Sequence, residues 1–435
     1  MTQPSSARAR LDEALARIDD PRGEGARACL TVYRDSAIAE AEASDRRRAT
    51  GALRGPLDGT IVSIKDLFDV AGEVTRAGSR ILAEEGAPAA RDAEVVRRLR
   101  EAGAVIVAKT NMTEFAFSGV GSNPHYGTPG NPADRTRVPG GSSSGAAVAA
   151  ADAMCEIAIG SDTGGSTRIP AALTGIVGWK PSKARIPTEG AFPLSTTLDS
   201  IGPLATTVAR CAEADAVMAG EAPGPLPRVA LAGLRIGVVQ GFPLDRLDDT
   251  VATAFDDACR RLSQAGARLS DETLAPLAAM VEVNRRGGIV PYEAHRIHRD
   301  RLARRLGDFD PKIAARIRRA ETIADADYAW MLSERRRLVT AMDEQLAAFD
   351  LAVMPTVPIV APTLAAVDSD DGFARNNALL LRNTSIGNFF DLCAASLPIP
   401  GGGLPTGLML VGRNGHDRRL LAIAAAVEAL FAAGR

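Results

Sequence analysis

The fold is decided by residues 155–180, CEIAIGSDTGGSTRIPAALTGIVGWK, in which two apolar runs flank a glycine-rich turn. The run CEIAIG predicts a buried strand, the segment that begins near Arg168 predicts a short helix, and GIVGWK predicts a second strand. Upstream, RDAEVVRRLREAGAVIVAKTN predicts a helix over about 92–102 and a buried strand over about 104–108. Such alternation of helices and strands is typical of an α/β fold.

Other segments extend this alternation along the chain. An Ala-rich helix is expected over about 145–153, and LRIGVVQ, LAVMP and GLMLVG are expected to be strands. DRRLLAIAAAVEALF predicts a closing helix. Residues 6–19 and 26–47 predict surface helices, and residues 248–348 read as almost wholly helical. The Pro- and Gly-rich stretch 220–233 is not expected to separate domains, because strand candidates on both sides of it could share one sheet.

The turn within the deciding stretch places Gly164 and Gly165 directly before Ser166. Glycine adopts backbone angles that are closed to other residues and lets a ligand approach the main chain. Successive N–H groups that precede a helix form an anion site. A phosphate loop would read GxxxxGK[ST], but GSDTGGST has Ser166 where the lysine belongs. The turn therefore favours a transient oxyanion beside a nucleophilic serine.

A serine nucleophile needs a base, and the sequence offers two patterns. GSSSG, residues 141–145, matches the GxSxG elbow of α/β-hydrolases with Ser143 as nucleophile, but NPADRTRVPG before it cannot be the central strand that this elbow requires. The other pattern is Lys65 at the end of GTIVSIKD. Burial would lower the lysine pKa from ~10.4 toward neutrality and make the amine a proton acceptor. An ion pair of Lys65 with Asp66 or Asp69 is the structural alternative.

Three motifs in order, GTIVSIKD, GGSSSG and GSDTGGSTRIPAALTGIVGWKPS, resemble the amidase signature family. Ser142 lies 24 residues before Ser166, which is the spacing of that family's two catalytic serines. The similarity continues through AKTNMTEFAFSG, YGTPGNP, LDSIGPLATTV, VMPTVP and LPTGLMLVG. It covers about residues 45–215 closely and about 350–430 more loosely.

The resemblance implies a Ser–cis-Ser–Lys mechanism. Ser166 would be the nucleophile, Lys65 the base, and Ser142, preceded by a cis peptide bond, the proton relay between them. The implied oxyanion hole consists of the backbone N–H groups of Thr163, Gly164, Gly165 and Ser166.

Supporting roles also follow from the resemblance. Asp162 and Arg168 would brace the loop by charge-assisted hydrogen bonds, and Ser161 would contact Lys65 or Ser142 through its hydroxyl. Ser143 and Ser144 are expected to brace the loop rather than to react.

The implied architecture is the amidase signature fold, with a mixed, twisted central sheet covered by helices on both faces. We expect one domain over residues 1–435, with a signature core at about 45–215, a helical substrate-side insertion at about 245–350, and C-terminal strands and helix at 350–435. A homodimer through the N-terminal helices is compatible with this arrangement.

The implied reaction is hydrolysis of a small carboxamide to a carboxylate and ammonia through a Ser166 acyl-enzyme, without metal or cofactor. Two alternatives remain: the A subunit of the glutamine-dependent tRNA amidotransferase, and a hydrolase of biuret- or allophanate-type urea derivatives. The amidotransferase subunit typically reads YGLVAFASSLDQIGP, whereas this chain has IPTEGAFPLSTTLDSIGPL. That departure favours a free-standing amidase.

Two residues are candidates for substrate binding. Arg382 lies in ALLLRNTSIGNFFDLCAASLPIP, which would line the substrate mouth, and could bind a substrate carboxylate or form a surface ion pair. Tyr126, with His125, lies in the irregular segment 121–145 and could contact substrate or stabilise the loop.

Composition excludes several other classes of function. A formal net charge of −2 disfavours nucleic-acid binding, and no apolar run approaches the roughly 18 residues of a membrane helix. The polar N-terminal residues lack a signal-peptide core, so we expect a cytoplasmic protein. His295 and His298 could share a helical face as metal ligands, but the basic HRIHRDRLARR around them favours a solvated face. A non-catalytic interaction protein is disfavoured, because all three catalytic positions are filled.

Overall fold

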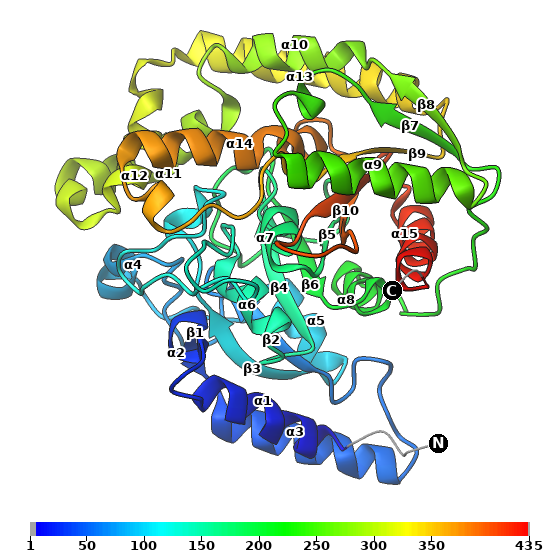
Figure 1. Cartoon of the computed structure of the whole chain (residues 1–435). Coiled ribbons are helices and arrows are strands. Elements are labelled where there is room, and N and C mark those ends of the chain that lie inside the picture. The colour runs from blue at the N-terminus through cyan, green and yellow to red at the C-terminus, as the bar shows by residue number, and fades with distance from the viewer. Residues whose placement is uncertain (1–5, 434–435) are drawn as a thin grey trace.

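A single mixed sheet forms the centre of the computed structural model, which describes residues 6–433 (Figure 1). Its eleven strands within the described residues run in the order β1-β3-β2-β4-β6-β5-β10-β11-β9-β7-β8. The strands are β1 Cys29–Val32, β2 Ile61–Lys65, β3 Val105–Thr110, β4 Ile157–Asp162, β5 Val177–Lys180, β6 Ser200–Ala205, β7 Arg235–Val239, β8 Arg268–Glu272, β9 Leu351–Pro355, β10 Cys393–Pro398 and β11 Gly407–Gly412. The α/β fold and the mixed sheet are as the sequence predicted.

Helices surround this sheet. They are α1 Ala7–Asp19, α2 Gly25–Ala28, α3 Arg34–Ala49, α4 Arg80–Glu85, α5 Glu94–Glu101, α6 Ser144–Ala151, α7 Arg168–Thr174, α8 Val208–Ala219, α9 Asp249–Gln264, α10 Ala275–Asn284, α11 Ile289–Arg305, α12 Pro311–Arg318, α13 Asp325–Leu346, α14 Asp370–Phe389 and α15 Asp417–Ala432. None of the helices within residues 6–433 is both long and apolar enough to cross a membrane.

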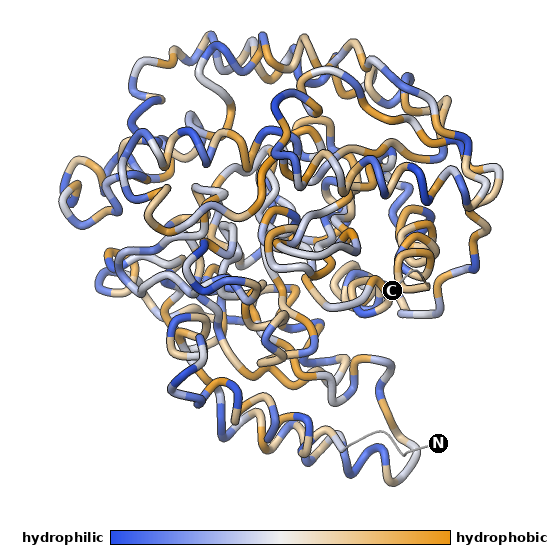
Figure 2. The backbone as a smooth tube through the Cα atoms, viewed as in Figure 1, coloured by the Kyte–Doolittle hydropathy of each residue, from blue (hydrophilic) through white to orange (hydrophobic). Residues whose placement is uncertain are grey.

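The central strands are buried on both faces because their side chains alternate between two apolar clusters. In β4, Ile157 and Ile159 pack into one cluster with residues of α5 and α8, whereas Ala158 packs into the other with α1 and α6. In β3, Ile106 packs into the first cluster and Val105 into the second. This is the two-residue period of a strand, and it explains why the parallel strands read as continuous apolar runs (Figure 2).

Parallel pairing in β2, β3 and β4 brings the carboxyl ends of these strands together. Val62, Ser63 and Ile64 of β2 lie opposite Ile157, Ala158 and Ile159 of β4. Lys65, one residue further along β2, and Ser161, two residues further along β4, therefore lie at the same edge of the sheet. Antiparallel pairing then continues from β4 to β6, β5 and β10, so the later strands join the same sheet.

Two sequence expectations about secondary structure were wrong. Segment 26–47 is not one helix: the apolar run Cys29–Val32 forms β1 and pairs antiparallel with β3, which divides α2 from α3. The stretch 248–348 contains β8, which pairs in parallel with β7. The sequence prediction also omitted β6, β10, α8 and α14. In β6, Gly202 and Pro203 conceal the strand pattern.

The stretch 220–233 leads from α8 into β7, and β6 and β7 belong to the same sheet, as expected from the strand candidates on both sides. The helices of residues 249–346 lie with α14 on one side of the molecule, and α1 and α3 lie on the opposite side (Figure 1).

Candidate active site

Lys65 ends β2 with its amine completely buried. Its Nζ lies 2.7 Å from Oγ of Ser142 and 2.9 Å from Oγ of Ser161. The neighbouring Asp66 accepts instead from Arg76, and Asp69 accepts from the Thr75 hydroxyl, so neither alternative ion pair with Lys65 forms within residues 6–433. Burial lowers the pKa of Lys65 to about 7, against the opposing effect of the Asp162 and Asp199 carboxylates. A neutral amine at this position can accept a proton from Ser142.

The serine loop and the glycine turn meet beside this lysine. The Gly141–Ser142 peptide bond is cis, as the family resemblance implies. The N–H of Ser143 donates to the carbonyl oxygen of Ser166 at 3.4 Å, and the Ser143 hydroxyl donates to the carbonyl of Ser161. Ser143 thus holds the two loops together and does not occupy a nucleophile elbow.

Asp162 organises the turn from the end of β4. The Arg168 guanidinium donates to both carboxylate oxygens, at 3.0 and 2.9 Å, and both side chains are fully buried. The N–H groups of Gly165 and Thr167 also donate to this carboxylate. Burial alone would raise the pKa of Asp162, but Arg168 outweighs it and holds that pKa well below its usual range. The anion is therefore permanent and fixes the backbone around Ser166.

Helix α14 holds the same turn from its other side. The Asn388 amide donates to the carbonyl and the carboxylate of Asp162, and the Thr384 hydroxyl donates to the carbonyl of Gly164 at 2.6 Å. Gly165 has a φ of +134°, and a Cβ there would lie 2.1 Å from Oγ1 of Thr384. Only glycine fits at this position.

This packing removes one of the predicted oxyanion donors. The N–H of Gly165 points at Oδ1 of Asp162, at 2.8 Å, and Gly165 does not line the cavity. Thr163, Gly164 and Ser166 do line it. Of the four predicted donors, the N–H of Gly165 is thus engaged by Asp162, whereas the other three residues border the cavity.

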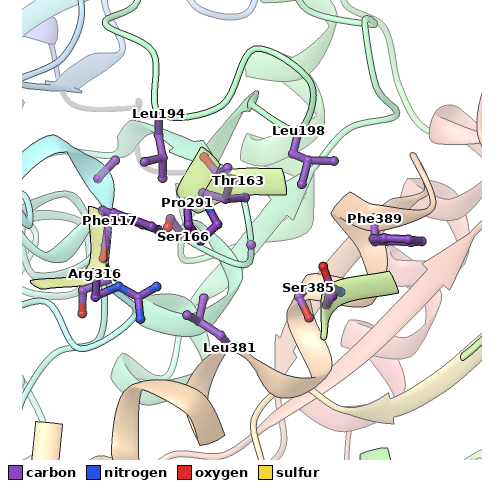
Figure 3. A pocket seen from close by; sticks show the side chains of 15 residues that line it. Phe117, Thr163, Ser166, Leu194, Leu198, Pro291, Arg316, Leu381, Ser385 and Phe389 are labelled. Atoms are coloured by element: carbon purple, nitrogen blue, oxygen red, sulfur yellow. Dashed lines mark hydrogen bonds between the residues drawn. The ribbon is translucent and has the colours of Figure 1, made fainter. Parts of the chain in front are cut away.

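A cavity of about 150 Å³ opens in front of Ser166 (Figure 3). Its walls are mostly apolar, with a few polar groups. The lining comprises Ala116, Phe117, Ser118, Thr163, Gly164, Ser166, Leu194, Leu198, Asn284, Val290, Pro291, Arg316, Leu381, Ser385 and Phe389. Because ligand sites for drug-sized molecules usually occupy 300 Å³ or more, this volume favours a small substrate.

The charged group in this lining is Arg316 of α12. Its Nε donates to the carbonyl of Phe117 at 2.9 Å, and the guanidinium lies over the Phe117 ring, 4.5 Å from its centroid. Within residues 6–433 no carboxylate pairs with it. Burial, together with Arg319, lowers the pKa of Arg316 to about 10, so it remains a cation at neutral pH. In Figure 3 the guanidinium extends into the space between Phe117, Ser166 and Leu381.

Neither predicted substrate-binding residue lines this cavity. The Arg382 guanidinium donates to the backbone carbonyls of Asp245 and Pro243, which fixes a loop instead of facing Ser166. Tyr126 donates to the carbonyl of Ser79 at 3.4 Å and packs near Arg76. Segments distant in sequence supply backbone acceptors for both side chains, so Tyr126 takes the loop-stabilising role considered above and Arg382 forms no ion pair within residues 6–433.

The histidine pair was also misjudged. His298 is fully buried rather than solvated, with its ring 4.0 Å from that of Phe115 and close to Phe192 and Phe309. Burial lowers the pKa of His298 to about 3, so the ring is neutral. In residues 6–433 no cluster of three or more His, Cys, Asp or Glu side chains is arranged to hold a metal.

With this geometry established, comparison with known proteins identifies the family. The amidase family model matches residues 11–421. The chain belongs to the amidase family. It is an enzyme of the amidohydrolase type, which acts on C–N bonds.

Three curated relatives illustrate the range of activities. The 2-amino-5-chloromuconic acid deaminase of Comamonas testosteroni is 37% identical, covering 91% of this chain and 86% of the relative. The A subunit of the glutamyl-tRNA(Gln) amidotransferase of Acidothermus cellulolyticus is 35% identical, covering 98% and 90%. The AtzE subunit of the 1-carboxybiuret hydrolase of Pseudomonas sp. (strain ADP) is 34% identical, covering 94% and 91%. Two of these amidase relatives are thus named as subunits.

A solved structure described as an amidase has a TM-score of 0.88, with 34% identity over 98% of this chain and 96% of the other. The fold described above is therefore that of amidase signature enzymes.

Site residues missed by sequence analysis lie mainly outside the signature core. Arg316 comes from α12, whose sequence carries no recognisable motif. Thr384 and Asn388 lie in the segment 378–400 that the sequence analysis placed at the substrate mouth, but their contacts with the glycine turn were not visible there. Asp199, within LDSIGPL, accepts from the Thr163 hydroxyl at 2.5 Å. The motif was visible in the sequence, but its contact with Thr163 was not.

The buried ion pair yields a prediction for stability. Asp162→Asn would leave the Arg168 guanidinium without its counter-charge, and we expect the free energy of unfolding to fall by about 3–5 kcal/mol. Urea denaturation followed by circular dichroism measures this. The control is Asp300→Asn, whose side chain is 85% exposed. A change at Asp162 no larger than at Asp300 would show that the pair does not stabilise the fold.

Proposed function

We propose that this amidase hydrolyses the C–N bond of small, carboxylate-bearing amides through an acyl-enzyme on Ser166. The observation that carries the proposal is the buried hydrogen bond between Lys65 and Ser142, next to the turn that presents Ser166 to the cavity. Such an arrangement supplies a neutral amine, a hydroxyl relay and a nucleophile without a cofactor.

In acylation, Oγ of Ser166 attacks the amide carbonyl carbon. The Ser166 proton passes to Oγ of Ser142 as the proton of Ser142 passes to Nζ of Lys65. The carbonyl π electrons move onto oxygen, and backbone N–H groups of Thr163, Gly164 and Ser166 stabilise this oxyanion. When the C–N bond breaks, the proton on Lys65 returns through Ser142 to the nitrogen, which leaves as ammonia.

Deacylation repeats these steps with water. Lys65 takes a water proton through Ser142, the resulting hydroxide oxygen bonds to the acyl carbon, and the ester C–O bond breaks. The proton on Lys65 returns through Ser142 to Oγ of Ser166, and the acid product leaves as a carboxylate after its remaining water proton passes to solvent. Protons balance over the cycle, so Lys65 ends neutral and ready to act again.

The substrate class follows from the cavity. A small, largely apolar space that contains the Arg316 cation favours a short acyl chain that ends in a carboxylate held by this guanidinium. The names of two relatives, a chloromuconic acid deaminase and a carboxybiuret hydrolase, also denote carboxylic acids. Because one relative is named as a carboxybiuret hydrolase subunit, urea derivatives are a second candidate class of substrate. The amidotransferase subunit remains a third, favoured by 35% identity over 98% of the chain.

Substitution and labelling of Ser166 test the proposal directly. Ser166→Ala should lower kcat for amide hydrolysis by a factor on the order of 10⁴, because the nucleophile is lost. A fluorophosphonate probe should label Ser166 in the wild type, as read by peptide mass spectrometry. Ser36→Ala, on the exposed face of α3, is the control. Undiminished hydrolysis by Ser166→Ala would remove the catalytic assignment.

The pH profile reports on Lys65. Protonated Lys65 cannot accept the Ser142 proton, so kcat/KM should fall about tenfold per pH unit below pH 7 and level off above it. Initial rates between pH 5 and 9 in constant ionic strength measure this. Lys65→Met should lose both the activity and the profile. A flat wild-type profile over this range would contradict a Lys65 base.

The role of Arg316 can be separated from that of Arg382 by comparing succinamate with neutral butyramide. Arg316→Gln should lower kcat/KM for succinamate about tenfold or more relative to butyramide, because it removes a charge-assisted hydrogen bond. Arg382→Gln should leave the ratio of the two values unchanged, since that side chain binds backbone carbonyls. The reverse pattern would restore Arg382 as the carboxylate ligand.

A further inference from the structure

A second cavity, of about 230 Å³, lies between α12 and α14 and adjoins the first. The side chains of Arg316 and Leu381 line both, so they form the partition between them. On the α14 side, Asn377 lines the second cavity and accepts from the hydroxyl of Ser118, which lines the first. The two cavities thus share walls made by the same elements.

Basic residues follow the side of α12 that faces this second cavity. Lys312, Arg316 and Arg319 are spaced four and three residues apart, and all three line it. Lys312 donates to the backbone carbonyls of Val367 and Asp368, which holds its charge in place.

Arg319 differs from its neighbour. It begins the 3₁₀ turn η4 (Arg319–Thr322) that continues α12, and within the described residues 6–433 no carboxylate pairs with it. Arg318 does not line the cavity and is paired with Glu321, Nε to Oε1 at 2.8 Å. Arg319, which has no carboxylate partner among the described residues, therefore lines the cavity, whereas the paired Arg318 does not.

The charges in this lining do not balance. One carboxylate, Asp370 in the first turn of α14, opposes the three cations. Asp370 also lies in the first turn of α14, where the positive end of the helix dipole stabilises its charge. Its carboxylate therefore only partly neutralises the charges of the two arginines. The remaining lining is apolar or amide, including Phe373 and Asn377. Arg316 and Arg319 repel each other, which an anion between them would relieve.

We propose that the cavity between α12 and α14 is a second anion subsite, in which Arg319 binds a second carboxylate of the substrate. The inference rests on the proposed function in one respect: Ser166 marks where the scissile amide lies. It narrows the substrate class to small amides that carry two carboxylates, the first on Arg316 beside the amide and the second on Arg319.

Ligand binding to a Ser166→Ala background tests this without catalysis. Calorimetric titration with glutarate, adipate and pimelate is compared with pentanoate, hexanoate and heptanoate, so that each pair differs in one carboxylate. We expect at least one dicarboxylate to bind about fivefold or more tightly than its monocarboxylate partner. This preference should weaken as salt rises, because Arg319 is exposed.

Two further variants locate the effect. Adding Arg319→Gln should abolish the dicarboxylate preference, whereas the matched Arg318→Gln should retain it, because that side chain is paired outside the cavity. Asp370→Asn, which removes the opposing carboxylate, should strengthen the preference.

An absent preference, or one that survives Arg319→Gln, would overturn the subsite. The result of this binding experiment does not depend on whether the enzyme hydrolyses amides. If the wild type hydrolysed no amide but the preference depended on Arg319, the acyl-enzyme proposal would fail while the second anion site would stand.

Discussion

The buried carboxylate of Asp162 is the constraint on which the rest of the site depends. It ends the central strand β4, accepts from Gly165, Thr167 and Arg168 on one side, and contacts Asn388 of α14 on the other. A buried anion is stable only when donors surround it, so its presence fixes each of those donors in place. The turn around Ser166 is rigid because moving it would strip a charge of its partners, and the same contacts join the signature core to the C-terminal half.

Lys65 lies under opposing influences. Removal from water favours the neutral amine, whereas the charges of Asp162 and Asp199 favour the cation. The result is a pKa near the neutral range, where a proton can be taken and returned at comparable free-energy cost. Asp199 also accepts from the Thr163 hydroxyl, so it acts both on the electrostatic field at the amine and on the position of Thr163, which lines the cavity. Chemistry and geometry are therefore coupled through the same few carboxylates.

The residues to which we assign the chemistry and many of the residues that line the cavity come from different parts of the chain. Lys65, Ser142 and Ser166 lie on strand ends and loops of the sheet core, where parallel pairing and buried hydrogen bonds set their positions. Part of the cavity wall comes from α10, α11, α12 and α14, which lie along one side of the molecule (Figure 1). In our proposal, helices outside the core can change the substrate without disturbing the residues to which we assign the chemistry.

The sequence by itself determined the α/β fold and most of its strands, and it selected Lys65, Ser142 and Ser166 as the positions to which we assign catalysis. These features depend on local patterns: apolar runs, glycines before a serine, and fixed motif spacing. It failed where the outcome depended on partners far along the chain. Arg382 and Tyr126 donate to backbone carbonyls of distant segments. His298 packs against Phe115 and Phe309, and the N–H of Gly165 donates to Asp162. Arg316, in a helix with no motif, entered the cavity. Only tertiary packing decides which side chain meets which acceptor, since hydrogen bonds and burial join residues whose separation in sequence carries no signal.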